Sequence, residues 1–209
     1  MTSQKTRKQA TVHRILGAAA QMFAETGYEG ARIDAIAELA GVNKAMIYYH
    51  IGDKKALYTQ VLHQIFGDVA ARMTNNINRA RTPLDKIRAY IASIRQTLAK
   101  HPYLPPIMMH ELASGGHHLP EIVANDLASI IGLISDVVAQ GCRESDFNRI
   151  DPFVLHLMVI GGVSYFKTSD PLRLRYAKLM GKNITIKVDP DGFDLLKEIE
   201  AIIVSALSK

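Results

Sequence analysis

Residues 41–58 read GVNKAMIYYHIGDKKALY, and this stretch decides the fold. Asn43 is a favoured helix N-cap, and Gly52 predicts that the helix beginning there ends near His50. So short a helix is not stable alone, so neighbouring helices must support it. It also cannot bury all of its adjacent rings, Tyr48, Tyr49 and His50. One of the two tyrosines is expected to turn toward a small core, and the other rings remain for a partner.

The residues just before this stretch predict the supporting helix. Apolar residues recur at helical spacing from Ile33 to Ala40, and Gly41 is placed to take the left-handed conformation that ends the helix. Two short helices, 33–40 and 44–50, joined by so tight a turn form a helix-turn-helix. Ile36, Ala37 and Ile47, together with the first helix of the chain, are expected to form its core.

A helix-turn-helix presents the N-terminal residues of its second helix to the major groove of duplex DNA. Lysine donates to guanine acceptors, and alanine or methionine packs on a thymine methyl group, so Lys44, Ala45 and Met46 are candidates for base contacts. The hydroxyls of the tyrosines and the imidazole of His50 can donate to phosphate oxygens. Lys54 lies in the first turn of the next helix, where free backbone amides also attract a phosphate.

The rest of the chain has helical periodicity almost throughout. Helices are predicted at about 6–26, 53–73, 83–100, 120–140, 153–167 and 193–207, with a shorter one between the prolines and glycines of 101–116. In 168–191, LRLRYAKLMG can form a short helix, whereas NITIKVD looks extended. The segment is mobile or packs on a partner subunit, because a connection of this length is unusual in a compact domain. The sequence therefore predicts an all-α protein of about nine helices.

Composition limits the class of protein. Hydrophobic residues make up 48% of the 209 residues, which is typical of a folded chain. The single Cys142 excludes an internal disulfide and a four-cysteine zinc site. The longest apolar run, 153–166, is too short to span a bilayer, so we expect a cytoplasmic protein without a membrane partner. Eight Lys and Arg against five Asp and Glu make residues 1–60 the most basic part, which weakly favours a polyanionic partner there and equally fits a solvated face.

Residues 27–57, GYEGARIDAIAELAGVNKAMIYYHIGDKKAL, resemble the DNA-binding signature of the tetracycline-repressor (TetR/AcrR) family of one-component regulators. The matching pieces are the Gly-Tyr pair, Ile-Ala in the second helix, Ala-Gly-Val at the turn, the aromatic pair with histidine, and Asp-Lys-Lys-Ala-Leu. The family often has Ser or Thr at Arg32 and Ile33, and Phe at Ile51. Arg32 can replace a hydroxyl as a phosphate donor, with more charge and longer reach.

The resemblance implies a dimeric transcriptional regulator, most simply a repressor that a small-molecule effector releases from its operator. The operator would be a duplex pseudo-palindrome. Residues 1–52 would bind DNA, and residues 53–209 would bind the effector and dimerise. No enzymatic activity, cofactor or metal is expected. The expected DNA contacts are Arg32, Asn43, Lys44, Ala45, Met46, Tyr48, Tyr49, His50 and Lys54.

The same resemblance implies a dimer interface made by the last two long helices and a pocket enclosed by the helices of the middle of the chain. The expected interface residues are Val154, Met158, Gly161, Gly162, Leu196, Ile199, Ile203 and Leu207. The candidate pocket residues are Tyr103, Met108, Met109, His110, His156, Tyr165 and Phe166. Each of these side chains could instead belong to the core, and helix 153–167 could be a central core helix only.

Three other functions compete with this interpretation. The histidines at 101, 110, 117, 118 and 156, with Glu111 or Asp126, could bind a transition metal, but no predicted helix carries two histidines four residues apart. An enzyme is disfavoured because the chain has no nucleophile elbow, no phosphate-binding glycine loop and no paired carboxylates on one helix face. A helix-turn-helix that binds protein would differ in lacking salt-sensitive binding to random duplex DNA.

Overall fold

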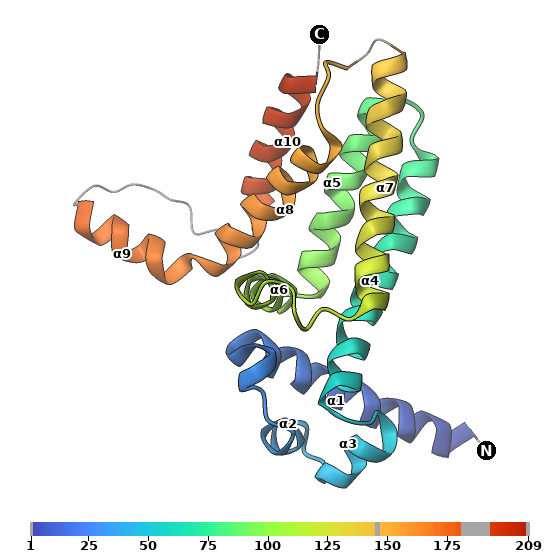
Figure 1. Cartoon of the computed structure of the whole chain (residues 1–209), viewed down its shortest axis with the longest axis vertical. Helices are drawn as coiled ribbons and strands as arrows, with labels where there is room; N and C mark the ends of the chain where they lie inside the picture. Colours follow the sequence, from blue (N-terminus) through green and yellow to red (C-terminus); the bar gives the residue numbers. More distant parts are fainter. Residues whose placement is uncertain (1, 145–146, 181–192, 208–209) are drawn as a thin grey trace. The chain divides into compact units, whose positions relative to one another are not determined.

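The computed structural model describes residues 2–144, 147–180 and 193–207. Within these ranges the chain folds into ten helices with no extended strand, which confirms the all-α prediction and is close to the expected number (Figure 1). The helices are α1 (Thr2–Gly30), α2 (Ile33–Ala40), α3 (Lys44–His50), α4 (Lys54–Arg79), α5 (Pro83–Lys100), α6 (Leu104–Ala113), α7 (Glu121–Arg143), α8 (Pro152–Thr168), α9 (Asp170–Met180) and α10 (Phe193–Leu207).

The helix boundaries follow local signals in the sequence. Gly41 ends α2 in the left-handed conformation, with φ 62° and ψ 42°. The Asn43 side chain accepts a hydrogen bond from the Ala45 amide at 2.9 Å and so caps α3. Thr82 and Asp151 cap α5 and α8 in the same way, each followed by a proline in the first turn. Caps and left-handed glycines act within a few residues, which is why they can be predicted from the sequence.

Several predictions about the helices need adjustment, and α4 runs to Arg79 where an end at about residue 73 was predicted. Gly27 has φ 70° and ψ 178°, so it interrupts the helix as expected, but helical residues resume and α1 extends to Gly30. The short helix in LRLRYAKLMG is present as α9, and it accounts for the additional helix. The extended stretch NITIKVD lies outside the described residues.

The chain divides into two compact units, which share α4, α6 and α7 along the sequence. Unit 1 consists of residues 1–67 and 106–126, and unit 2 consists of residues 68–105 and 127–209. By packing, the helix-turn-helix therefore belongs with the start of α4, most of α6 and the start of α7. The functional division at residues 52 and 53 remains a prediction, because packing and function need not divide a chain at the same place.

In unit 2, α10 packs on α5 and α8. Gly162 permits the close approach of α8 and α10, since a Cβ atom there would lie 3.1 Å from the Ile199 Cδ1 atom. Three residues that were expected at a dimer interface are instead fully buried in the core of their own unit: Leu196, Ile203 and Leu207. The sequence shows the apolar stripe of α10. It does not show that this stripe packs against the rest of the same unit.

Among the described residues, α7 is the one helix that could cross a membrane by length and composition, with a mean hydropathy of 1.7 in its most apolar stretch. Core helices of soluble proteins have the same properties. Ile134 and Val138 of α7 are buried in unit 2, but only 28% of its most apolar stretch is buried in the described structure. The composition of α7 therefore carries no argument for a membrane location.

Candidate nucleic-acid interface

The helix-turn-helix has the small core that the sequence predicted. Ile36 and Ile47 are fully buried and Ala37 nearly so, and α1 and α3 both pack on α2 or its turn. Ile47 is the single buried residue of α3. One isoleucine thus holds the helix in place, and the rest of its surface is free to face outward.

The aromatic residues of α3 point away from this core. Tyr49 is 81% exposed and Tyr48 is 50% exposed, and the Tyr49 and His50 rings meet edge to face at 4.9 Å. The expectation that one tyrosine turns inward is wrong, because Ile47 fills the available space. Met46 and Ala45 are also exposed. A surface helix with two exposed tyrosines and a methionine offers ring faces, hydroxyl donors and an apolar contact to a partner.

Lys44, the first residue of α3, forms an ion pair inside the motif. Its Nζ atom lies 2.8 Å from the Asp34 Oδ1 atom, and both side chains are largely exposed. The hydrogen bond between them raises the pKa of Lys44 and lowers the pKa of Asp34. Lys44 therefore remains charged, but a DNA base or phosphate has to compete with Asp34 for its ammonium group.

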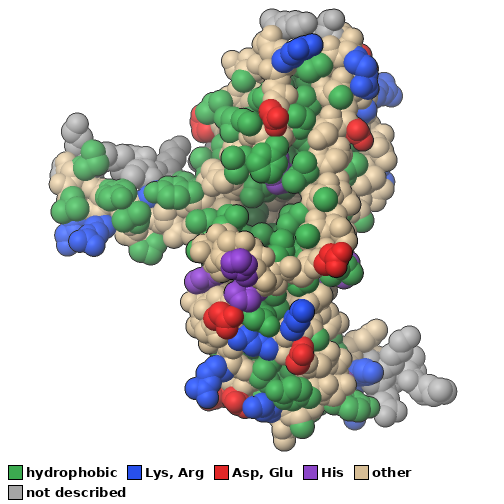
Figure 2. All heavy atoms as spheres, viewed as in Figure 1, with side chains coloured by type: hydrophobic (Ala, Val, Ile, Leu, Met, Phe, Trp, Pro, Cys, Tyr) green, Lys and Arg blue, Asp and Glu red, His purple; other side chains and the backbone are tan. Residues whose placement is uncertain are grey.

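Three other expected contacts occupy the edges of the motif. Arg32 is exposed and extended at the N-cap position of α2, where its side chain makes no capping bond. The Asn43 oxygen caps α3, which leaves its NH₂ group as a donor. His50 is half-buried, and its Nδ1 atom is enclosed without a hydrogen-bond partner. On the face of unit 1 seen in Figure 2, Lys and Arg side chains alternate with acidic ones.

Lys54 is held against the end of α1. Its Nζ atom donates to the Glu29 carbonyl oxygen at 3.1 Å and lies 4.6 Å from the centre of the Tyr28 ring. One of its three N–H donors is thus used, and two are available for a phosphate. This arrangement fixes the position of the charge at the start of α4, whereas a free lysine would lose side-chain entropy on binding.

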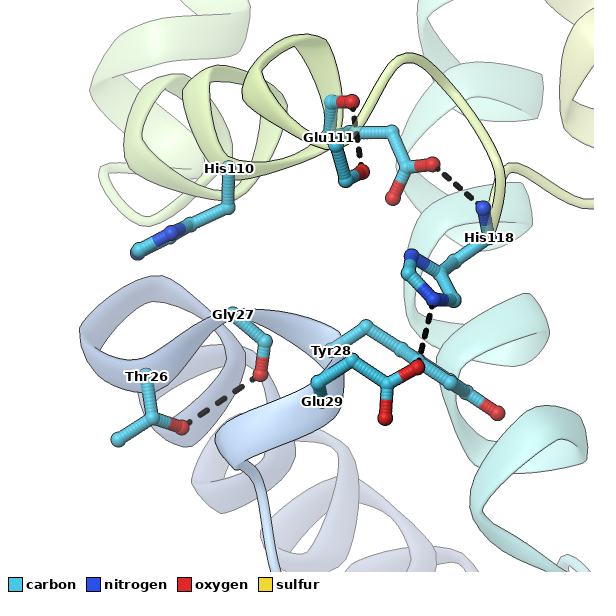
Figure 3. A pocket seen from close by; sticks show the side chains of 8 residues that line it. Thr26, Gly27, Tyr28, Glu29, His110, Glu111 and His118 are labelled. Carbon is cyan, nitrogen blue, oxygen red and sulfur yellow. Dashed lines mark hydrogen bonds and ion pairs between the residues drawn. The ribbon is translucent and has the colours of Figure 1, made fainter.

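A buried carboxylate joins α6 to the helix-turn-helix within unit 1. Glu111 is only 3% exposed, and its two oxygens accept hydrogen bonds from the Tyr58 hydroxyl and the His118 amide, each at 2.8 Å. The His118 ring continues the network, since its Nε2 atom lies 2.8 Å from the Glu29 carboxylate and the ring stacks on Tyr28 (Figure 3). These contacts tie the loop after α6 to the ends of α1 and the start of α4.

A small cavity of about 160 Å³ lies at this junction. Figure 3 shows His110 and His118 on opposite sides of this cavity, and Gly27 and Glu29 of α1 face α6 across it. A Cβ atom at Gly27 would come within 3.2 Å of the His110 ring, so the glycine is required both for its positive φ and for this approach. Burial and the bond to Glu111 raise the pKa of Tyr58, so its hydroxyl stays protonated as a donor.

The candidate effector-binding residues do not form one group. Met108, Met109 and His110 belong to unit 1, and His110 lines the cavity there. In unit 2, Tyr103 and Tyr165 are exposed, whereas Phe166 packs against Arg173, whose Cζ atom lies 3.6 Å from the ring centre. His156 is half-buried and bonded to Tyr90. An effector role for these residues stays a prediction, and two exposed tyrosines fit an enclosed pocket poorly.

The outer face of α8 remains available to a partner subunit. Val154 and Met158 are exposed, as are their neighbours Phe153, Leu157 and Tyr165. Gly161 lies on the same face, and a Cβ atom there would meet nothing within 4 Å. Ile202 adds an exposed apolar side chain on α10. Part of the expected interface is thus on the surface, although the buried residues of α10 are not.

No group of three metal-ligand side chains lies together in the parts of the chain that the structure describes. Asp126, one of the residues considered for such a site, lies 2.7 Å from the ring of His63. Sequence reasoning missed this pair, the Lys44–Asp34 pair and the contacts of Tyr58 and Tyr90. Each joins residues that are distant in the sequence or on different helices, so no short-range signal marks it.

Comparison with known proteins agrees with this geometry. Residues 15–61, which include the whole helix-turn-helix, match the family described as "Bacterial regulatory proteins, tetR family". The HTH-type transcriptional regulator RutR of Escherichia coli O157:H7 is 30% identical over 157 residues, covering 75% of this chain and 74% of RutR. The HTH-type transcriptional repressor NicS of Pseudomonas putida is 28% identical over 168 residues, covering 77% and 76% of the two chains.

Solved structures share the fold at low sequence identity. The regulator FadR from Bacillus subtilis, solved in complex with stearoyl-CoA, superposes with a TM-score of 0.70 and 19% identity over 93% of this chain and 98% of FadR. A tetR-family regulatory protein from Rhodococcus superposes with a TM-score of 0.72 and 16% identity over 95% and 97% of the chains. The chain therefore belongs to the tetR family of bacterial regulatory proteins and is a helix-turn-helix transcriptional regulator.

Proposed function

We propose that this protein is a cytoplasmic homodimeric repressor that binds a pseudo-palindromic operator through α3 and leaves it when a small-molecule effector binds. The observation that carries the proposal is the outward face of α3. One buried isoleucine supports a helix whose tyrosines and N-terminal lysine are exposed. This is the arrangement by which a recognition helix enters the major groove.

Each residue of the interface has a role that follows from its chemistry. Lys44, Ala45 and Met46 lie in the first turn of α3 and would read base edges. Tyr48, Tyr49, Arg32 and the Asn43 amide would donate to phosphates and fix the register without reading sequence. Lys54, held by Glu29, would give a phosphate contact of fixed geometry at the start of α4. His50, beside Tyr49, would orient that ring.

Dimerisation through the outer face of α8 would bring two such motifs to one operator. The exposed apolar residues of α8 and the open space at Gly161 support an interface of closely approaching helices. Effector control is supported by the likeness to FadR, whose structure holds stearoyl-CoA. A ligand changes DNA binding only by its preference for one conformation, and a hundredfold preference corresponds to about 2.7 kcal/mol.

Selection of duplexes from a random library by the full-length protein tests the DNA-binding role. We expect enrichment of a pseudo-palindrome whose half-sites are one helical turn, roughly 34–36 Å, apart. Affinity for the selected duplex should fall steeply as the salt concentration rises. Protein binding releases cations that are condensed on the DNA phosphates, and added salt opposes this release. A Tyr49→Ala, Lys44→Ala double variant is the negative control. If wild type and double variant both enrich nothing, the proposed function is wrong.

A helix-turn-helix that binds protein is the second candidate, and the exposed rings of α3 are compatible with it. The two functions differ in their response to DNA alone. Binding to a random duplex that weakens with salt is expected for the repressor. Complete absence of duplex binding at about 50 mM salt, with a folded dimer in solution, would favour the protein-binding module.

A further inference from the structure

Unit 2 contains a polar pair, the buried Tyr90 and the half-buried His156, that lies outside the helix-turn-helix. Tyr90 of α5 is fully buried, and its hydroxyl oxygen lies 2.8 Å from the Nδ1 atom of His156 on α8. The two ring centres are 6.2 Å apart. A buried polar pair weakens a helix–helix contact relative to apolar side chains, so its presence calls for a chemical reason.

The surroundings of the pair fix where its hydrogens lie. Burial raises the pKa of Tyr90 and lowers the pKa of His156, so the phenol keeps its proton and the imidazole is neutral near pH 7. A buried hydroxyl must donate to an acceptor, and His156 Nδ1 is its partner among the described residues. Tyr90 therefore donates to Nδ1, and the single hydrogen of the imidazole lies on Nε2.

The Nε2–H group of His156 is left as an accessible donor. It has no partner among the described residues, and it is not one of the enclosed polar atoms of the structure. His156 shares a helix face with Val159 and Val163, three and seven residues later, and both are buried. The half-buried His156 is thus on the side of α8 that carries buried valines.

Figure 2 shows a hollow in the surface over α5, between α8 and α7, edged by hydrophobic side chains. The helix α8 thus carries a donor with a fixed orientation, and it borders a hollow with an apolar edge. Small-molecule sites typically combine an apolar lining with a few placed polar groups.

We propose that His156 donates a hydrogen bond from Nε2 to an uncharged carbonyl oxygen of the effector, whose remaining body is apolar, and that Tyr90 is the positioning residue that holds this tautomer. This assignment rests on the proposed function in calling the bound molecule an effector. The donor site itself depends only on the geometry of α5 and α8.

A neutral carbonyl suits the site better than a carboxylate. A buried carboxylate needs a compensating charge or several donors, and here it would meet a neutral ring whose tyrosine partner is already engaged. Lys86, one turn before Tyr90, directs its ammonium group at the Gln140 side-chain oxygen, 2.6 Å away. An alcohol could accept the bond, but its own hydrogen would then lack an acceptor among the apolar residues.

The first experiment measures the tautomer. Histidine ring nitrogen spectra of the full-length protein, with His156→Gln used to assign the resonance, should show a protonated Nε2 and an acceptor Nδ1. In Tyr90→Phe the same ring should shift toward a mixture of tautomers. A protonated Nδ1 in the wild type, or no change in Tyr90→Phe, would overturn the assignment of Tyr90.

The second experiment compares three probes of similar shape: acetophenone (neutral carbonyl), cumene (no acceptor) and benzoate (carboxylate). Calorimetric dissociation constants are measured with wild type, His156→Phe and His156→Gln, whose amide nitrogen can replace the Nε2 donor. We expect the preference for acetophenone over cumene to fall about tenfold in His156→Phe and to be largely kept in His156→Gln. Benzoate should bind more weakly than acetophenone to the wild type.

Three results would overturn the proposal: the same preference in wild type and His156→Phe, tighter binding of benzoate, or no binding of acetophenone. The unfolding transition of each variant is recorded in parallel, and the two substitutions at one position separate loss of the donor from loss of packing. DNA binding is measured independently. Failure of the operator selection with retained acetophenone preference would refute the repressor function alone.

Discussion

The helices α3 and α8 use their exposed surfaces in opposite ways. α3 is seven residues long, buries Ile47 alone and exposes two tyrosines and a lysine. α8 is 17 residues long, buries Leu155, Val159 and Val163 on one side and exposes apolar side chains on the other. An outward face of donors and rings suits a polar duplex, and an outward apolar face suits another protein surface. The comparison distinguishes the proposed DNA contact of α3 from the proposed subunit contact of α8. The predictions below test the two regions and the packing that supports them.

The largest effect is expected from a charge on the outer face of α8. Leu157 is 56% exposed within its own protomer, so Leu157→Glu should leave the fold intact. In a symmetric interface the substitution buries two carboxylates, and roughly 3 kcal/mol or more of dimer stability should be lost. Operator affinity should then fall at least roughly 100-fold, because a monomer reads one half-site.

Sedimentation velocity at micromolar concentration, together with operator titration, measures the effect of Leu157→Glu. Leu112→Glu is the matched control, since Leu112 is an exposed leucine of α6 in unit 1. A dimer that survives Leu157→Glu would show that the apolar face of α8 is not the subunit contact.

The next largest effect concerns the support of α3 within unit 1. Glu111→Ala removes the acceptor of the Tyr58 hydroxyl and of the His118 amide, and should lower the free energy of unfolding by roughly 3 kcal/mol. Glu111→Gln keeps the size and an acceptor, so a loss of about 1 kcal/mol is expected. Urea unfolding measures both changes, with exposed Glu38→Ala as a control near zero.

If Glu111→Gln were as harmful as Glu111→Ala, charge would matter more than hydrogen-bond acceptance. If neither variant changed stability, the buried network would not support the helix-turn-helix. Either result would show that hydrogen bonds accepted by Glu111 support α3 less than the structure indicates. The contrast drawn above between α3 and α8 would then be weaker.

A smaller effect is expected at the first residue of α3. Lys44→Ala should weaken binding to the selected operator roughly tenfold and relax the preference for one base pair. Asp34→Asn should strengthen binding slightly, because it frees Lys44 and removes a negative charge beside the phosphates. Fluorescence anisotropy on operator and single-substituted duplexes measures both, with exposed Lys178→Ala of α9 as control. Equal losses on all duplexes would make Lys44 a phosphate contact.

The smallest effect is a pH dependence of stability from the histidine of α8. Burial holds the pKa of His156 below its ordinary value of 6.5. The unfolded chain then takes up a proton more readily than the folded protein, so folding is disfavoured as the pH falls below about 6.5. The free energy of unfolding of the wild type should therefore fall relative to His156→Gln as the pH is lowered.

His101 is the matched control for this pH dependence, because burial lowers its pKa as well. His101→Gln should show a difference in the same direction. Unfolding in urea over a series of pH values measures both. A stability difference between wild type and His156→Gln that does not change with pH would mean that the ring of His156 is as well solvated in the folded protein as in the unfolded chain.

Much of the fold could be predicted because its signals are local. Pro83 and Pro152 open helices, Asn43 caps one, and Gly41 adopts the positive φ that ends another. That α3 could not bury all of its adjacent rings also followed from its short length. The prediction that one tyrosine of α3 turns inward was wrong, because Ile47 fills the buried space. The prediction for α10 was wrong for another reason: an apolar stripe on a helix looks the same whether it packs on a partner subunit or on its own core.

The sequence by itself determined that this protein is helical, where most of its helices begin and end, and that a short helix with exposed rings follows a glycine turn. It could do so because capping, glycine geometry and helical periodicity depend on residues a few positions apart. Only the tertiary structure decided that Lys44 pairs with Asp34, that Glu111 joins Tyr58, and that the Tyr90 hydroxyl meets His156. These contacts depend on which helix faces pack together, and burial then decides which hydrogen bonds must be made.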